Sequence, residues 1–170
     1  MSEPSILIAG IGNIFLGDDA FGCEVLKHLM ERSWPDNVRV ADFGIRGFDL
    51  SYALLDGYDV TILVDATPRG GAPGTIYKIE PELSELETFD REIQVVETHG
   101  MNPLKVLSMV KSMGGEFKKL LLIGCEPETF GPEEGLMGLS ESVQAAVPEA
   151  VKLIESVVAD HLESATQEVF

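Results

Sequence analysis

A small set of ionisable side chains stands directly after apolar segments or just before an expected helix. The set consists of Asp18, Asp19, Asp42, Asp65 and His99. In open α/β sheets, ligands bind beyond the carboxyl ends of the strands, so side chains at these points can converge. Two carboxylates and one imidazole with open positions suit a divalent transition metal, and both groups are available in ligating form near neutral pH. The pattern therefore predicts a site for such a metal.

The aspartates also have structural explanations. An aspartate beside a helix start can cap the helix, a role that we assign to Asp18 rather than to Asp19. Asp42 opens the sequence Asp-Phe-Gly-Ile-Arg-Gly, where an aspartate close to glycine commonly forms a turn, so both roles stay open. Asp65 ends the most apolar segment, and its carboxylate would lose solvation without a partner. We therefore expect Asp65 to be functional.

His99 and Arg46 complete the candidate residues. His99 precedes an expected helix start at Asn102-Pro103, and we expect it to face the same crevice. Arg46 could hold a substrate carboxylate or polarise a carbonyl, and it could equally lie on the surface. The sequence contains neither the Gly-x-Ser-x-Gly turn of serine hydrolases nor a His-Glu-x-x-His zinc pair. Carboxylates and one histidine are thus the groups that remain for chemistry.

The elements that must position these residues alternate along the chain. Short apolar runs predict strands at 5–9, 38–41, 58–66, 75–79 and 119–125. Apolar side chains at helical spacing predict helices at about 20–32, 47–55 and 103–113, and a last helix that starts after Ser140 and continues past Pro148. This alternation predicts an α/β fold, a single α/β/α sandwich around a twisted, mostly parallel sheet of about five strands. We expect one domain over residues 1–163 and a flexible tail at 164–170.

The first glycine-rich turn differs from a dinucleotide-binding turn. Gly10-Ile11-Gly12-Asn13 follows an apolar strand, but the dinucleotide fingerprint needs a third small residue where this chain has Phe15. Asp18 and Asp19 would also oppose a bound pyrophosphate with like charge. The turn therefore favours presenting oxygen ligands over cradling phosphate.

Composition and charge narrow the function classes. With 12 basic and 29 acidic residues, the net charge is −17, which argues against nucleic acid as a partner. Acidic residues cluster in surface-like stretches at 80–87 and 126–134. No segment has the pattern of a signal peptide or of a membrane span, so we expect a cytoplasmic protein without membrane insertion. Cys23 and Cys125 lack metal-ligand spacing and are expected to be buried thiols.

Several segments together resemble the hydrogenase maturation endopeptidases, the C-terminal processing proteases of nickel-iron hydrogenase large subunits. These segments are the Gly-Ile-Gly-Asn to Asp-Asp-Ala-Phe-Gly stretch (10–22), Asp-Phe-Gly-Ile-Arg-Gly (42–47), Ile-Leu-Val-Asp-Ala (62–66), Ala-Pro-Gly-Thr (72–75), His-Gly (99–100) and Gly-Cys-Glu-Pro (124–127). The resemblance covers nearly the whole chain. It implies that Asp19, Asp65 and His99 bind the nickel of the substrate, and that the loop with Asp42 and Arg46 faces the substrate. Some relatives carry glutamate at the position of Asp19, so that ligand arm is one methylene shorter here.

The implied reaction is a proteolysis gated by the substrate. A precursor large subunit arrives with nickel inserted, the three residues take open coordination positions on the nickel, and a peptide bond is cleaved to release the C-terminal extension. A metal-polarised carbonyl, a metal-activated water and an aspartate general base are all chemically reasonable. Two other functions fit part of the sequence: a checkpoint for nickel insertion that does not cut, and another hydrolase such as peptidyl-tRNA hydrolase, which the acidic charge disfavours.

Overall fold

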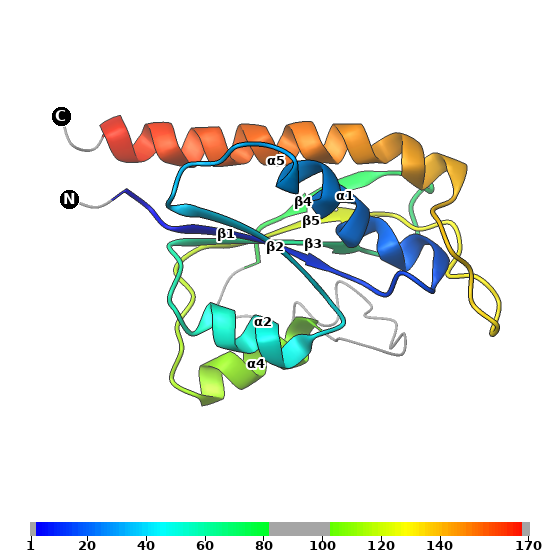
Figure 1. Ribbon diagram of the computed structural model, residues 1–170, viewed down its shortest axis with the longest axis horizontal. Coiled ribbons are helices and arrows are strands. Elements are labelled where there is room, and N and C mark those ends of the chain that lie inside the picture. Colours follow the sequence, from blue (N-terminus) through cyan, green and yellow to red (C-terminus); the bar gives the residue numbers. More distant parts are fainter. Residues whose placement is uncertain (1–2, 82–102, 168–170) are drawn as a thin grey trace.

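The computed structural model describes residues 3–81 and 103–167 (Figure 1). At its centre is a five-stranded sheet with the strand order β2-β1-β3-β5-β4. The strands are β1 (Ile6–Ile11), β2 (Val38–Gly44), β3 (Val60–Ala66), β4 (Ile76–Ile79) and β5 (Leu120–Cys125). β1, β2, β3 and β5 are parallel to their neighbours, whereas β4 pairs with β5 in the antiparallel sense. The predicted mostly parallel sheet is confirmed.

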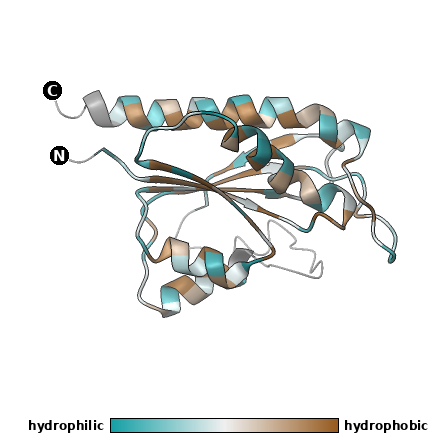
Figure 2. Ribbon diagram, in the orientation of Figure 1, coloured by the Kyte–Doolittle hydropathy of each residue, from teal (hydrophilic) through white to brown (hydrophobic). Residues whose placement is uncertain are grey.

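Helices cover both faces of the sheet. α1 (Phe21–Met30) and α5 (Glu141–Gln167) pack on one face, and α2 (Gly47–Leu54) and α4 (Pro103–Ser112) pack on the other (Figure 1). Figure 2 shows the hydrophobic colour concentrated in the central strands, while the helices carry both hydrophobic and hydrophilic residues. The architecture is therefore the predicted α/β/α sandwich.

The alternation of side chains along each central strand supplies both cores. In β1, Ile6 and Ile8 pack with α1 and α5, whereas Leu7, Ala9 and Ile11 pack with α2 and α4. Parallel strands that are covered on both faces are apolar throughout, because successive side chains enter opposite cores. For this reason the uninterrupted apolar runs of the sequence correctly predicted the central strands.

Close packing between α1 and the sheet depends on a glycine. A Cβ added at Gly22 would overlap the backbone carbonyl oxygens of Ile11 and Val64, so α1 can lie directly against β1 and β3. A dinucleotide-binding turn has its close-packing glycine three residues after the second glycine, at the position of Phe15 here. In this chain a loop and a 3-10 helix, η1 (Gly17–Ala20), come before α1, and Gly22 takes over the packing role.

The elements differ from the predicted bounds mainly at their ends. β2 continues to Gly44 rather than ending at residue 41, because its pairing with β1 continues through a register shift to Ile11. α5 passes Pro148 without a break and continues to Gln167, so residues 164–167 of the expected tail are helical (Figure 1). Leu162 still packs against the apolar core, which anchors α5 close to its C-terminal end.

The two cysteines, Cys23 and Cys125, are buried and free, as predicted. Within residues 3–81 and 103–167, no helix combines the length and the apolarity that a membrane span requires. The predictions for residues 82–102, which include His99 and the helix cap at Asn102, lie outside the described residues.

Candidate active site

The strand order reverses between β1 and β3. From β1 the chain passes through α1 to β2 on one side of β1, and from β2 it passes through α2 to β3 on the other side. In open α/β sheets, such a reversal point at the carboxyl ends of the strands is where ligands bind. Asp19 follows β1, and Asp65 is the penultimate residue of β3. The structure therefore places both predicted carboxylates at the reversal point.

Asp19 is held by the glycine-rich turn that precedes it. The backbone N–H of Asn13 donates a hydrogen bond of 2.8 Å to Asp19 Oδ2. Gly12 permits this close approach, because it has a φ of +145° and a Cβ there would overlap the Asp19 carbonyl oxygen. Burial raises the pKa of Asp19, and the Asn13 N–H partly offsets that rise. The side chain is partly exposed, so it can still reach a ligand.

Asp65 lies partly buried at the end of an apolar strand. Its Oδ1 accepts a 2.8 Å hydrogen bond from the backbone N–H of Ala66. Burial raises the pKa of Asp65 well above its ordinary value, the negative charge of Asp19 raises it further, and the Ala66 N–H lowers it. Neither Asp65 nor Asp19 forms an ion pair with another residue of the described chain. The two carboxylates thus repel each other, and no cation among residues 3–81 and 103–167 pairs with them.

Cys23 is a neighbour of these carboxylates that the sequence analysis missed. Its thiol lies 3.5 Å from the Gly12 carbonyl oxygen. Burial raises the pKa of Cys23 most, and the negative charges of Asp42, Asp65 and Asp19 add to the rise. The thiol is therefore kept protonated, which disfavours it as a nucleophile. Its position one helical turn after Asp19 is the sequence signal that could have found it.

Asp42 and Arg46 lie together in the turn between β2 and α2. Asp42 Oδ1 accepts a 2.9 Å hydrogen bond from the Gly44 N–H, which is the turn role that the sequence left open. Its effect on Cys23 also shows that it belongs to the same carboxylate neighbourhood. The exposed Arg46 guanidinium donates to the Asp42 carbonyl oxygen at 2.6 Å and lies 3.4 Å from Asp49. Arg46 is thus held by its own turn while it faces solvent.

Asp18 has a different role from its neighbour. It is completely buried, and its carboxylate accepts hydrogen bonds from Glu128 N (2.8 Å), Thr129 N (3.1 Å), Ser140 N (2.7 Å) and Ser140 Oγ (2.8 Å). The predicted cap is wrong, because no side chain caps η1 or α1. Asp18 instead holds the segment 126–140 beside η1. Because this segment is distant in sequence, a local pattern could not predict the contact.

Glu126 is a second structural carboxylate that the sequence did not reveal. Its Oε1 accepts hydrogen bonds from the N–H groups of Arg69 (2.9 Å) and Gly71 (2.8 Å) and from the Tyr77 hydroxyl (2.7 Å). The side chain is buried, although it belongs to a stretch that was predicted to be surface-like. Glu126 therefore orders the loop between β3 and β4 instead of offering a free ligand.

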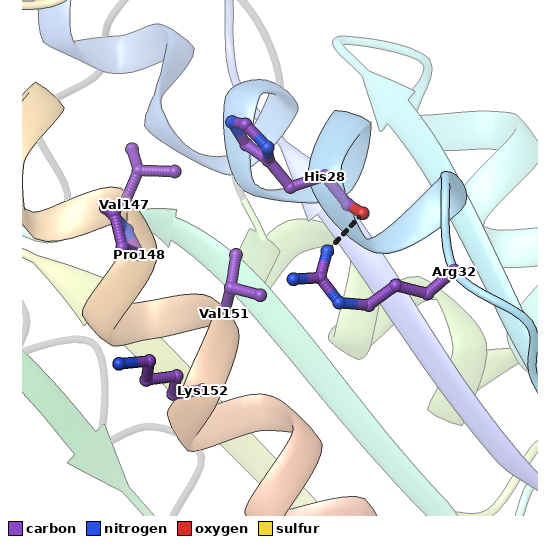
Figure 3. Close-up of a pocket in the computed structure, with 6 residues that line it drawn as sticks. All are labelled: His28, Arg32, Val147, Pro148, Val151 and Lys152. Carbon is purple, nitrogen blue, oxygen red and sulfur yellow. Dashed lines mark hydrogen bonds between the residues drawn. The ribbon is translucent and has the colours of Figure 1, made fainter.

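A small cavity lies at a different place in the molecule. It has a volume of about 140 Å³ between α1 and α5, and His28, Arg32, Val147, Pro148, Val151 and Lys152 line it (Figure 3). The Arg32 guanidinium donates to the His28 carbonyl oxygen at 2.7 Å. His28 and Arg32 lie towards and just beyond the C-terminal end of α1, whereas Asp19 precedes its N-terminal end. This cavity is therefore separate from the carboxylate site.

The fold and the site together define a class of protein. The molecule is an α/β/α sandwich that places two carboxylates, unpaired within the described chain, at the reversal point of its sheet, an arrangement suited to cation-assisted hydrolysis.

Comparison with known proteins identifies the family. The family model described as hydrogenase maturation protease matches residues 23–157. The hydrogenase 2 maturation protease of Escherichia coli is 31% identical over 171 residues, which cover 96% of this chain and 94% of that protein. The structure of the hydrogenase maturating endopeptidase HybD from E. coli, 29% identical, superposes with a TM-score of 0.74 over 92% of this chain and 93% of that one. The maturation protease HycI of Thermococcus kodakarensis, 28% identical, has a TM-score of 0.63 over 95% and 94% of the two chains. The chain belongs to the hydrogenase maturation protease family and is an endopeptidase of hydrogenase maturation.

Proposed function

We propose that this protease removes the C-terminal extension from the nickel-loaded precursor of a nickel-iron hydrogenase large subunit in the cytoplasm. The observation that carries the proposal is the pair Asp19 and Asp65, two partly buried carboxylates without a cation partner among the described residues. A cation brought by the substrate relieves their repulsion, so binding is strongest when the substrate carries its metal.

The donor set supports a metal that belongs to the substrate. Within the described chain, no group of three His, Cys, Asp or Glu side chains could hold a metal ion. Asp19 and Asp65 supply two oxygen ligands of the proposed site, and the precursor fills the positions that the ligands of this chain leave open. His99 is the third ligand of the proposal; it rests on the family resemblance and lies outside the described residues. An incomplete site of this kind discriminates between precursors with and without nickel.

Hydrolysis requires that a water molecule attack the scissile carbonyl carbon and that the leaving amine gain a proton. The nickel of the substrate can polarise the carbonyl or activate the water. A carboxylate with a raised pKa can take the proton of the water and then give it to the leaving amine as the C–N bond breaks, and Asp65 has such a pKa. The side chains of Asp19, Asp65 and His99 are therefore the proposed catalytic residues.

Asp42 and Arg46 are the proposed substrate-binding residues. The turn that carries them follows β2 and is joined to the glycine-rich turn by a 3.0 Å hydrogen bond from Gly12 N to Gly44 O. The exposed guanidinium of Arg46 donates to the carbonyl oxygens of Asp42 and Phe43 in its own turn and to Asp49 in α2. It is thus positioned to bind a carbonyl or carboxylate of the precursor beside the catalytic carboxylates.

The test is incubation with the cognate precursor, with and without nickel, followed by intact-mass measurement. We expect a loss of mass only for the nickel-loaded precursor, and no loss with Asp19→Asn or Asp65→Asn. Asp59→Asn is the matched control, since Asp59 lies at the opposite end of the sheet and bonds to Ser5 and Lys118. Stable binding of the loaded precursor without any loss of mass would contradict cleavage and indicate a non-cutting checkpoint.

A further inference from the structure

Two loops beside Asp19 expose four large apolar side chains. Ile14 and Phe15, in the loop between β1 and η1, are 45% and 59% exposed. Leu136 and Met137, in the segment that leads to α5, are 40% and 65% exposed. We call these four side chains the apolar ridge. Figure 1 shows the two loops side by side at the end of the sheet where β1 and β5 finish.

Backbone hydrogen bonds join the two loops of the apolar ridge. Leu136 N donates to Phe15 O at 2.9 Å, and Gly17 N donates to Leu136 O at 2.8 Å. Leu16 and Leu136 accordingly form a parallel β-bridge. The buried carboxylate of Asp18 also holds these two loops together through its four hydrogen bonds. The apolar side chains are thus displayed on a pre-ordered backbone, which reduces the entropy cost of binding a partner.

The apolar ridge is continuous with the catalytic carboxylates. Phe15 N donates to Asn13 Oδ1 at 2.9 Å, and Asn13 N donates to Asp19 Oδ2 at 2.8 Å. These two hydrogen bonds connect the backbone of the apolar ridge, through Asn13, to the proposed catalytic side chain of Asp19. A partner that binds the apolar ridge therefore lies close to Asp19.

The charge around the apolar ridge indicates the chemistry of its partner. Glu128, Glu133 and Glu134 are exposed in the same segment as Leu136 and Met137. None of these three glutamates forms an ion pair within residues 3–81 and 103–167. An apolar patch with an acidic rim matches a partner that combines apolar and basic side chains.

We propose that the apolar ridge docks the hydrogenase precursor through an apolar segment flanked by lysine or arginine, and so directs the scissile bond to Asp19. This inference rests on the proposed function and names the surface that selects its substrate. Phe15 and Met137, the two most exposed members, are the anchors of the contact. Glu133 and Glu134 pair with the basic side chains and increase the rate of association.

The test compares Phe15→Ser and Met137→Ser with Met30→Ser. Met30 is 57% exposed at the far end of α1 and is a matched control for loss of an exposed methionine. We expect each ridge variant to weaken binding of the precursor and to raise KM about tenfold, with kcat unchanged. Met30→Ser should bind and cleave like the wild type. Phe15 and Met137 lie in separate loops, so local damage to one loop would not explain weaker binding by both variants. Circular dichroism verifies that both variants fold.

A charge variant tests the predicted chemistry of the partner. Glu133→Lys combined with Glu134→Lys should slow association and reduce its dependence on salt. If the wild type cleaves the precursor while both ridge variants retain its affinity and KM, the docking proposal is overturned and the proposed function stands. If the wild type binds without cleaving and the ridge variants bind less, the docking surface stands and the cleavage proposal fails. If the wild type neither binds nor cleaves, both fail.

Discussion

The two ends of the sheet hold their carboxylates in opposite ways. At the amino end of the strands, Asp59 accepts hydrogen bonds from Ser5 N (2.8 Å) and from Lys118 Nζ (2.9 Å), and Lys118 and Ser5 lower its pKa. At the carboxyl end, the Ala66 N–H is the single donor to Asp65 among the described residues, and burial raises the pKa of Asp65. Asp59 ties three chain segments together, whereas Asp65 remains available to a ligand at a cost in stability. The contrast separates a carboxylate that stabilises the fold from a candidate catalytic one.

The same contrast recurs within two adjacent residues. Asp18 is saturated by four donors and is completely buried. Within the described part of the chain, the Asp19 carboxylate accepts a single hydrogen bond, from Asn13 N, and it stays partly exposed. Hydrogen-bond saturation therefore distinguishes the structural aspartate from the candidate catalytic one, although both have the same side chain.

The largest expected effect is on cleavage at the carboxyl end. Asp65→Asn should reduce the cleavage rate by roughly 10²- to 10⁴-fold, because it removes a ligand or base. The melting temperature should be unchanged or higher, because the variant no longer buries a carboxylate that has no cation partner in the described part of the chain. Intact-mass kinetics and thermal unfolding measure the two quantities. If Asp65→Asn lost both folding and activity, Asp65 would have a structural role, and the contrast between Asp59 and Asp65 would not hold.

The next effect concerns Asp18. Asp18→Ala leaves four donors without their acceptor, and we expect the free energy of unfolding to fall by about 3 kcal/mol or more. Asp19→Ala is the matched control. It should lower the free energy of unfolding by less than about 1 kcal/mol, because only the hydrogen bond from Asn13 N is lost. Urea denaturation measures the free energy of unfolding of both variants. Equal losses would mean that saturation does not distinguish the two aspartates.

A smaller effect is the pH dependence that Asp65 imposes on stability. The unfolded carboxyl group titrates near 3.8, and the folded group keeps its proton to higher pH. The associated stabilisation is complete below the unfolded pKa and is lost as the pH rises through the folded pKa. The free energy of unfolding of the wild type should therefore fall relative to Asp65→Asn as the pH rises from 4. Parallel stability curves for the two proteins would contradict the raised pKa.

The smallest effect is expected at the amino end of the sheet. Asp59→Asn should destabilise the protein at pH 7 by less than about 1 kcal/mol, because the pair with Lys118 is partly exposed and screened by water. The pKa of Asp59 is lowered, so its contribution is present above pH 3.8 and is lost as the pH falls through the folded pKa. Thermal unfolding above and below pH 3.8 measures the contribution of Asp59 to stability. The cleavage rate of Asp59→Asn should equal that of the wild type. Any loss of cleavage would show that the two ends are coupled.

The sequence predicted the features that depend on local patterns. The apolar runs of β1, β3 and β5 and the position of Asp65 at a strand end follow from alternating burial and from the cost of an unsolvated carboxylate. The roles of Asp18 and Glu126 could not be predicted, because their partners lie far along the chain. The start of α1 was close to its predicted position, yet the assignment of Asp18 as a cap was wrong. A cap and a long-range acceptor need the same residue type, and only the fold distinguishes them.

The position of β2 and β4 at the two edges of the sheet has a consequence for self-association. Within residues 3–81 and 103–167, no strand pairs with the outer side of β2 or β4, and such a row of backbone N–H and C=O groups can add a strand from another molecule. β4 is only four residues long, and each edge strand carries an exposed cation, Arg39 in β2 and Lys78 in β4. Two copies that met edge to edge would bring these like charges together. Two of the 12 basic residues in an otherwise acidic chain thus oppose the pairing of one sheet edge with another.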